Sequence, residues 1–316
     1  MKVADIITEP LQEAGSVFSG VDLLKMEVTE LPTLLEPIFP KVGMMGFAGS
    51  SDVGKSSFIR HFAVAVAVGQ KTFMNLNINA THRRAIYVSS EDAPDSLAFL
   101  LQKLNKEYRF NPTEFIGLKF ITETDNLLQR LEKELEADPV DLIVLDTFGD
   151  LYGKSMNESN QVRTFLNEYS QLAQKHQCLV IVLHHTGKRT DEFAPSKHNL
   201  LGSQGFESKM RLVVELRLDR YYTNRRHFCI VKGNYLSREF KESSYVLEMN
   251  ENFYFSNTGE RVPFAELGGE DNTQQLELES QVLELNKTGM TQIDIAVNLK
   301  TSQSKVSRIL KKHKSE

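Results

Sequence analysis

The 316-residue sequence contains no tryptophan and only two cysteines, Cys178 and Cys229, which both lie in apolar, strand-like runs. Two cysteines cannot build the disulfide framework of a small secreted domain. Buried free thiols in a reducing compartment are a simpler interpretation than a disulfide or a metal-binding pair.

The sequence also lacks an excess of basic residues and any long hydrophobic run. Its 37 lysines and arginines are outnumbered by 42 acidic residues, and the net charge is −5. This balance excludes a uniformly basic, histone-like binder of nucleic acid, but it does not exclude local basic patches. The N-terminal stretch MKVADIITEPLQEAG is acidic and amphipathic, unlike a signal peptide, and no apolar run approaches membrane-spanning length. We therefore expect a cytoplasmic protein.

Short apolar runs alternate with helical patterns along most of the chain. They span residues 42–48, 85–90, 118–122, 140–146, 178–185, 211–219 and 227–233. The early runs are apolar throughout, which is typical of parallel strands covered by helices on both faces. The later runs alternate more and have short connections, which favours antiparallel strands, and a final hairpin is expected over 243–257.

These patterns predict an α/β fold with a mainly parallel sheet, followed by a small all-α domain. We expect a helical arm over 1–40, an α/β core over 41–267, a polar linker over 268–275 and a helical domain over 276–316.

The stretch GSSDVGKSS fits the phosphate-binding pattern G-x-x-x-x-G-K-[ST] without a mismatch. Its glycines let backbone N–H groups curl around an anion, and the helix that follows adds the positive end of its dipole. Lys55 can reach the β- and γ-phosphates, and the Ser56 hydroxyl can ligate Mg²⁺. An ordinary glycine–serine turn would not explain the buried strand before the loop and the apolar helix after it. The predicted nucleotide-binding residues are Gly49, Ser50, Ser51, Asp52, Val53, Gly54, Lys55, Ser56 and Ser57.

Carboxylates at two strand ends could complete a hydrolytic site. VDLIVLD ends at Asp146, which is the Walker B pattern of a Mg²⁺ ligand. AIYVSS is followed by Glu91 and Asp92, and we interpret Glu91 as the base that activates the attacking water. Asp92 would then cap the following helix or support Glu91 without contacting the nucleotide. The alternative is that the pair only caps the following helix, because Asp92 comes shortly before Pro94 in the sequence.

A third apolar strand ends in His184 and His185. The two histidines could bind a metal, although no spaced Cys, His or carboxylate cluster accompanies them, or they could be a hydrogen-bonded core pair. Beside a nucleotide crevice, we favour a polar sensor of the γ-phosphate that passes the nucleotide state into the following loop.

This set of motifs resembles the RecA-like ATPases of the plasmid replicative helicase RepA group, which are relatives of the DnaB and KaiC proteins. The matching segments are GSSDVGKSS, IYVSSED, IVLDTFGDL, IVLHHTGK, LLGSQGFES and IVKGNYL. The resemblance implies a RecA-like core in a hexameric ring, with ATP and Mg²⁺ at the subunit interfaces. It also implies Glu91 as base, Asp146 for Mg²⁺ and one histidine of the pair as the switch. The guanine-reading motif N-K-x-D of GTPases is missing.

In such rings a neighbouring subunit supplies a cation to the γ-phosphate. Lys232 in IVKGNY fits that role, with Arg225 or Arg226 as other candidates, and a strand-end surface lysine is the plain alternative. The sequence departs from the family in two places. Members often place an arginine on the helix after the Glu-Asp pair, and the segment DSLAFLLQKL here has none. The loop between the motifs has lysine and histidine where the family is small and polar.

The loop over 186–205 carries Lys188, Arg189 and Lys197. The family resemblance places this loop in the central channel of the ring, where basic residues can track a single strand. The alternative is a solvated loop of mixed charge, since Asp191 and Glu192 partly offset the cations.

The C-terminal pattern MTQIDIAVNLKTSQSKVSRIL has helix-turn-helix spacing, with Ala296 at the close-packed position. Residues 300–316 hold six Lys or Arg against one acid, which favours phosphate contact. The alternative is a helical bundle that caps the ring or binds a protein. The residues expected on the exposed, groove-reading part of the second helix are Ser302, Gln303, Ser304, Lys305 and Arg308.

We therefore expect an ATP-hydrolysing, DNA-acting RecA-fold motor, a hexameric helicase that serves replication of a plasmid or mobile element. A DNA-binding ATPase switch, whose nucleotide state controls oligomerisation without unwinding, is the alternative. ATP, Mg²⁺, DNA and further copies of the chain are the expected ligands and partners.

Overall fold

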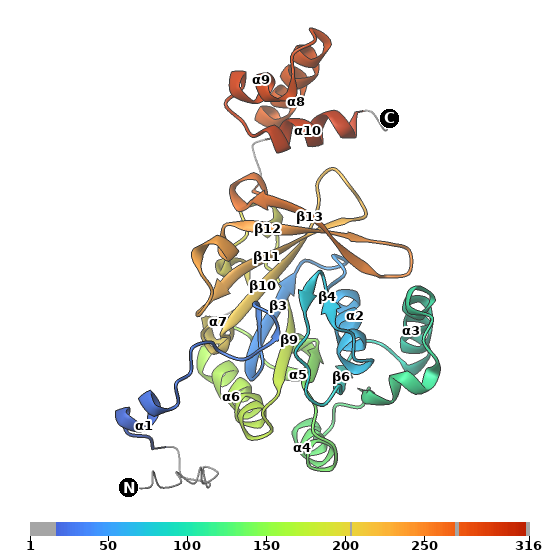
Figure 1. The fold of residues 1–316 in the computed structure, drawn as a ribbon, viewed down its shortest axis with the longest axis vertical. Coiled ribbons are helices and arrows are strands. Elements are labelled where there is room, and N and C mark those ends of the chain that lie inside the picture. The colour runs from blue at the N-terminus through green and yellow to red at the C-terminus, as the bar shows by residue number, and fades with distance from the viewer. Residues whose placement is uncertain (1–16, 203, 269–271, 314–316) are drawn as a thin grey trace, which may run out of the picture. The chain divides into compact units, whose positions relative to one another are not determined.

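The apolar runs predicted as strands all lie in one mixed sheet at the centre of the larger part of the chain (Figure 1). The computed structural model describes residues 17–202, 204–268 and 272–313. The strands that correspond to the runs are β3 (Gly43–Gly49), β6 (Ala85–Ser89), β7 (Leu118–Ile121), β8 (Leu142–Asp146), β9 (Leu179–His185), β10 (Leu212–Leu218) and β11 (Arg225–Gly233).

Among the described residues this sheet has nine strands, in the order β13-β12-β11-β10-β3-β9-β8-β6-β7. The strands from β10 to β7 pair in parallel, whereas β10, β11, β12 (Ser243–Met249) and β13 (Phe255–Pro263) pair antiparallel. The predicted change from parallel to antiparallel pairing is confirmed, and so is the final hairpin. Because the parallel strands run the same way, their carboxyl ends share one edge of the sheet.

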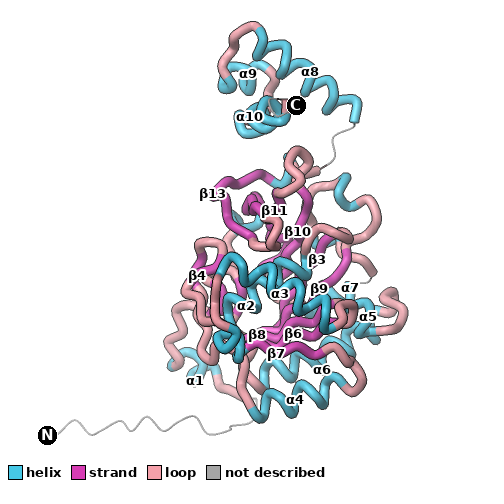
Figure 2. The backbone as a smooth tube through the Cα atoms, turned by 90° about the vertical axis from the view of Figure 1, so that its right-hand side faces the viewer, coloured by secondary structure: helices cyan, strands magenta, loops and turns pink. Residues whose placement is uncertain are grey.

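Helices cover both faces of the sheet (Figures 1 and 2). Alternate residues of β3 point to opposite faces, so Met45 and Phe47 pack with α2 (Lys55–Ala67) while Met44 packs on the other side. That second side is covered by α4 (Leu127–Ala137), α5 (Phe148–Tyr152) and α6 (Ser159–Lys175). The two-sided burial explains why the strands carry apolar residues at every position.

The other helices and strands of this core precede β3 or lie between the strands of the large sheet. They are β1 (Thr33–Leu35), β2 (Phe39–Pro40), β4 (Thr72–Phe73), β5 (Leu76–Asn77), α3 (Pro94–Tyr108) and α7 (Gln204–Lys209). Residues 1–32 and 33–316 form two units. In the first, α1 (Gly20–Lys25) begins at a capping box made by Ser19 and Asp22. The unit therefore ends at Pro32, earlier than the arm predicted over 1–40, because β1 and β2 belong to the second unit.

The C-terminal segment forms three helices, α8 (Asn272–Lys287), α9 (Gln292–Asn298) and α10 (Gln303–Lys312). Val282, Ile295, Ala296, Val306 and Ile309 make an apolar cluster of their own. Of the predicted linker over 268–275, residues 269–271 lie outside the described part, and α8 already begins at Asn272. A polar sequence is compatible both with a linker and with the first turn of a helix.

None of the helices within the described residues combines the length and the hydrophobicity that a bilayer span requires.

The stability of the sheet core depends on an aromatic cluster in which Phe228 is fully buried and contacts Phe39, Phe47 and Phe58. Phe228→Ala should lower the free energy of unfolding by about 3–5 kcal/mol, because it removes buried apolar surface and leaves a cavity. Urea unfolding followed by circular dichroism measures the change. Phe99→Ala, at an exposed position of α3, is the control and should change it by less than about 0.5 kcal/mol.

Candidate nucleotide site

The phosphate loop joins the end of β3 to the start of α2, as its sequence predicts. Two of its glycines are required by geometry. Gly54 has a positive φ of 94° directly before the helix, and a Cβ at Gly49 would lie 2.5 Å from the carbonyl oxygen of Leu216. The loop therefore presents its backbone N–H groups at a helix N-terminus, which is a site for an anion.

Lys55 is the first residue of α2 and its side chain folds back over the loop. Its Nζ donates a hydrogen bond to the Ser50 carbonyl oxygen at 2.7 Å. Burial lowers the pKa of Lys55, and the carboxylates of Asp146 and Glu91 oppose that shift. A phosphate in the loop would offer this buried ammonium a stronger acceptor than a backbone carbonyl.

Asp146 ends β8 and is almost completely buried beside the phosphate loop. The Tyr87 hydroxyl donates to its Oδ2 at 2.5 Å, whereas Oδ1 is buried without a hydrogen-bond partner among the described residues. Burial raises the pKa of Asp146, and hydrogen bonds from Tyr87 and Ser56 counteract the rise. An unpaired buried carboxylate oxygen near the Ser56 hydroxyl fits a Mg²⁺ ion, whose preferred ligands are oxygens.

Glu91 follows β6 at the same edge of the sheet, and its side chain is exposed. Partial burial, and after it the charges of Asp146 and Asp150, raise the pKa of Glu91. A carboxylate with a raised pKa, open to water and beside the phosphate loop, has the properties of a general base.

Asp92 does not cap the following helix, contrary to one of the two expectations. The N-cap of α3 is Ala93, which makes no side-chain cap hydrogen bond. Asp92 instead accepts a hydrogen bond and ion pair from the buried Arg60 of α2 at 2.7 Å. The guanidinium of Arg60 also lies over the ring of Tyr87, 5.5 Å from its centroid.

The two histidines at the end of β9 point to opposite faces of the sheet, as neighbouring strand residues must. His184 is buried against Phe148 and Phe206, its Nε2 lies 2.8 Å from the carbonyl oxygen of Leu201, and burial lowers its pKa to about 4. His185 is half-buried, and its pKa is lowered by burial and by Lys55. By the alternation along β9, His185 lies on the same face as Ile181 and Leu183, which pack with residues of α2. No cluster of three metal-ligating side chains occurs within the described residues.

A comparison with known protein families matches residues 9–191 to a family described as AAA domain, AAA_25. The chain belongs to this AAA domain family. Among solved structures, the ATPase Domain of G40P is similar, with a TM-score of 0.55, 12% identity and coverage of 75% of this chain and 95% of that one. The KaiC-like protein PH0186 from the archaeon Pyrococcus horikoshii OT3 has a TM-score of 0.51, 16% identity and coverage of 71% and 93%. No curated protein sequence matches the chain.

Family and fold together identify a RecA-like P-loop ATPase, which confirms the predicted fold class. Helicase activity, ring assembly and DNA binding stay predictions for this AAA domain.

The three candidates for the cation supplied to a neighbouring subunit have different partners within their own chain. Lys232 pairs with Glu207 of its own chain at 2.7 Å, and Arg225 pairs with Glu248 at 2.8 Å. Arg226 is buried, and its Nε donates to the Val53 carbonyl oxygen at 2.7 Å. Arg226 therefore supports the phosphate loop of its own chain and is not available to another subunit.

The predicted nucleic-acid residues differ in exposure. Lys188 and Arg189 are exposed, and Lys197 is half-buried with its Nζ 3.5 Å from Glu207. In α10, Gln303 and Ser304 are exposed and Ser302 caps the helix.

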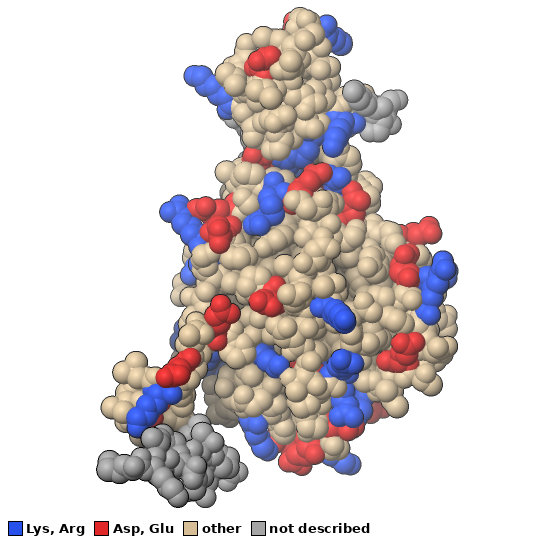
Figure 3. Space-filling model, in the orientation of Figure 1, with Lys and Arg blue, Asp and Glu red and all other residues tan. Residues whose placement is uncertain are grey.

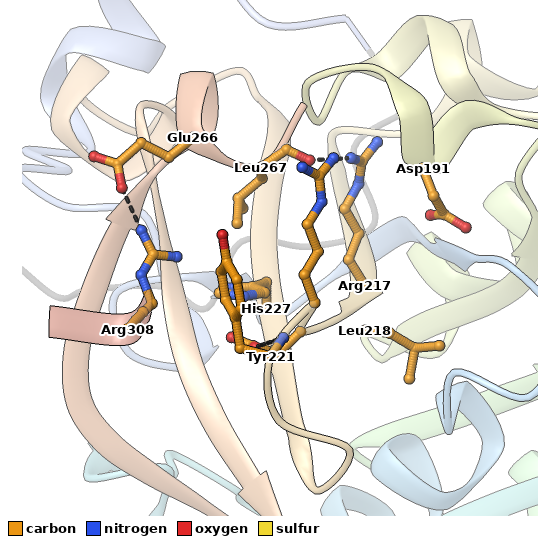
Figure 4. Close-up of a pocket in the computed structure, with 10 residues that line it drawn as sticks. Asp191, Arg217, Leu218, Tyr221, His227, Glu266, Leu267 and Arg308 are labelled. Carbon is orange, nitrogen blue, oxygen red and sulfur yellow. Dashed lines mark hydrogen bonds and ion pairs between the residues drawn. The ribbon is translucent and has the colours of Figure 1, made fainter. Parts of the chain in front are cut away.

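The prediction that Lys305 and Arg308 are exposed is wrong: both are buried. Arg308 forms an ion pair with Glu266, beside a cavity of about 180 Å³ (Figure 4). The partner of Arg308 lies 42 residues earlier in the chain, and spacing along a helix alone could not reveal such a contact.

Several residues of the site have no role assigned to them from the sequence. Tyr87 and Asp150 lie within the matching segments IYVSSED and IVLDTFGDL, and Arg60 lies in α2, which looks like an ordinary core helix. Asp150 of α5 accepts hydrogen bonds from the hydroxyls of Ser90 and Thr147 at 2.9 and 3.0 Å. Its place in the matching segment IVLDTFGDL was the available signal.

Tyr87→Phe should weaken the Mg²⁺-dependent part of ATP binding by about 10-fold, because the hydroxyl that orients Asp146 is lost while the ring still fills its place. Titration of a fluorescent ATP analogue at a series of Mg²⁺ concentrations measures it. Tyr108→Phe is the matched control, since that hydroxyl contacts His61 at 2.8 Å instead. An unchanged Mg²⁺ dependence in Tyr87→Phe would contradict the assigned role.

Proposed function

We propose that this AAA domain hydrolyses ATP to act on DNA, as the helicase-type motor of a plasmid or mobile element that works in a ring of identical subunits, predicted to be a hexamer. The observation that supports it best is the convergence of four functions at one sheet edge. A phosphate loop follows β3, a Mg²⁺ ligand ends β8, a carboxylate base follows β6 and a histidine ends β9.

Each group has a distinct chemical task in hydrolysis. The loop N–H groups and Lys55 hold the β- and γ-phosphates, and Asp146 with Ser56 would hold Mg²⁺. When bound, Mg²⁺ neutralises the charge that develops on the phosphate oxygens. Glu91 takes the proton of the attacking water, and His185 hydrogen-bonds toward the γ-phosphate position. The raised pKa of Glu91 brings its basicity closer to that of an effective base near neutral pH.

A role for Lys232 in a neighbouring site is supported by its place in the sheet. β11 runs antiparallel to β10, and Lys232 is level with Val213, which is itself level with Gly46 of β3. Gly46 comes three residues before the phosphate loop begins at Gly49. Lys232 is therefore two strands away from β3 and set back from the phosphate loop of its own chain, which favours a role across a subunit boundary.

A path from the nucleotide to the DNA-facing loop is supported by hydrogen bonds at the end of β9. The ring of His184 contacts the Leu201 carbonyl oxygen, and the Leu201 N–H donates to the His185 carbonyl oxygen at 2.9 Å. Thr186 and Leu200 form an isolated β-bridge. Both ends of the loop carrying Lys188 and Arg189 are thus attached to the histidine pair. On the face shown in Figure 3, basic and acidic side chains are interspersed.

Glu91→Gln should lower the ATPase rate by about 10²- to 10⁴-fold and leave nucleotide affinity nearly unchanged, because only the base is removed. ATP hydrolysis with and without single-stranded DNA, and strand displacement on a forked duplex, are measured. Glu251→Gln, on an exposed turn, is the control. ATPase stimulated by single strands, with displacement lost in Glu91→Gln, supports the motor. ATPase indifferent to DNA, in a chain that still binds duplex, supports the ATPase switch instead.

Mixing two inactive variants tests the shared site. Lys232→Ala and Glu91→Gln should each be inactive alone, whereas their mixture should regain part of the ATPase, because some interfaces then combine an intact Glu91 with an intact Lys232. ATPase is followed after subunit exchange. A Lys232→Ala protein with full activity, or a mixture that stays inactive, would contradict a contribution from the neighbouring subunit.

A further inference from the structure

A buried ion pair on β10 has no part in the nucleotide site. Glu215 and Arg217 lie two residues apart on one face of the strand, and the Arg217 Nε donates to Glu215 Oε1 at 2.7 Å. Both side chains are almost fully buried. A buried ion pair contributes little net stability by itself, because removing both charges from water costs about as much as their attraction returns.

The remaining hydrogen bonds of this pair all reach the loop after β9 or the chain near its tip. Arg217 donates to the carbonyl oxygens of Thr190 and Phe193, and at 3.3 Å to that of Leu267 (Figure 4). Glu215 accepts from the Ser196 N–H at 3.0 Å and from the Asn199 side chain at 3.1 Å. We call these two residues, with their contacts to the loop over 190–199, the loop clamp.

The loop clamp holds the backbone of the loop and leaves the side chains at the loop tip exposed to solvent. The Phe193 carbonyl oxygen is held by Arg217, yet the Phe193 side chain is 63% exposed. Its neighbours Asp191, Glu192 and Ala194 are exposed as well. A rigid backbone that presents a free aromatic ring has already lost the conformational entropy that binding would otherwise cost.

The charges around Phe193 are nearly balanced. Lys188 and Arg189 are opposed by Asp191 and Glu192, and Arg189 lies 3.7 Å from Glu192. Attraction to phosphates alone therefore gives this part of the loop little affinity. Stacking of a nucleobase on an aromatic ring needs no net charge and accepts any base.

We propose that Phe193 is a base-stacking residue for single-stranded nucleic acid, held in a binding geometry by the loop clamp of Glu215 and Arg217. The inference rests on the proposed function, because it takes a single strand as the substrate of the motor. It assigns the base contact to Phe193 and leaves phosphate contacts to Lys188, Arg189 and Lys197.

The test compares two fluorescent oligonucleotides of equal length, an oligothymidylate and a strand of abasic residues, by anisotropy with Mg²⁺ and a non-hydrolysable ATP analogue. The wild-type chain should bind the oligothymidylate more tightly. Phe193→Ala should weaken that binding by about 5- to 100-fold and bring the two strands to similar affinity. The salt dependence of oligothymidylate binding should be the same in Phe193→Ala as in the wild-type chain, because no charge is removed.

Phe193→Tyr keeps an aromatic ring and should keep the preference for bases, and so should the control Phe99→Ala, which also removes an exposed phenylalanine. Equal wild-type affinity for both strands, with ATPase still stimulated by DNA, overturns the stacking role and leaves the motor intact. ATPase indifferent to every strand overturns the motor itself. A Phe193→Ala variant that changes oligomeric state but not base preference shows that the ring contacts another copy of the chain, and also overturns the proposal.

Discussion

The position of the Asp146 carboxylate is the constraint on which the rest of the site depends. It is a charged group at the end of a buried strand, and such a group is stable only with partners. Tyr87 supplies a hydrogen bond to one oxygen from the neighbouring strand β6, while the other oxygen is left for a ligand. Burial and the adjacent carboxylate raise the pKa of Tyr87 well above its ordinary value, so the hydroxyl remains a donor. The parallel pairing of β6 and β8 is what brings the two groups together.

The two adjacent histidines at the end of β9 lie on opposite faces of the sheet and have different surroundings. Because side chains alternate between faces, His184 enters the core that holds Phe148 and Phe206, and His185 lies on the side of Lys55. A lowered pKa keeps His184 neutral, which suits a hydrogen bond inside an apolar cluster. A displacement of β9 by the nucleotide would therefore move a buried, well-packed residue and the loop end attached to it. Close packing makes such a connection stiff.

The sequence was a good guide where local patterns determine the structure. Continuous apolar runs located the strands of the core, and the phosphate loop was recognisable because glycines are needed at Gly49 and Gly54 for backbone reasons. Prediction failed where a side chain's role depends on which element packs against it. Arg226 was a candidate for a neighbouring site, yet it binds its own phosphate loop, and Arg308 was expected at the surface but is buried. Tyr87, Arg60 and the loop clamp depend on contacts between residues far apart in the chain, which no short pattern encodes.

The two acidic residues after β6 have their positively charged neighbours, Lys55 and Arg60, on α2. Asp92 lies next to Glu91 and adds to the negative charge around Asp146. Three carboxylates at one sheet edge repel each other and favour protonation of the base, and the charge of Lys55 opposes that effect on Glu91. Arg60 of α2 supplies a second cation, which pairs with Asp92. Since Arg60 also lies over the Tyr87 ring, the Mg²⁺ ligand and the carboxylate pair are linked through α2, the helix that begins at Lys55. Any movement of this helix when phosphate binds would then displace the partners of both Asp146 and Asp92.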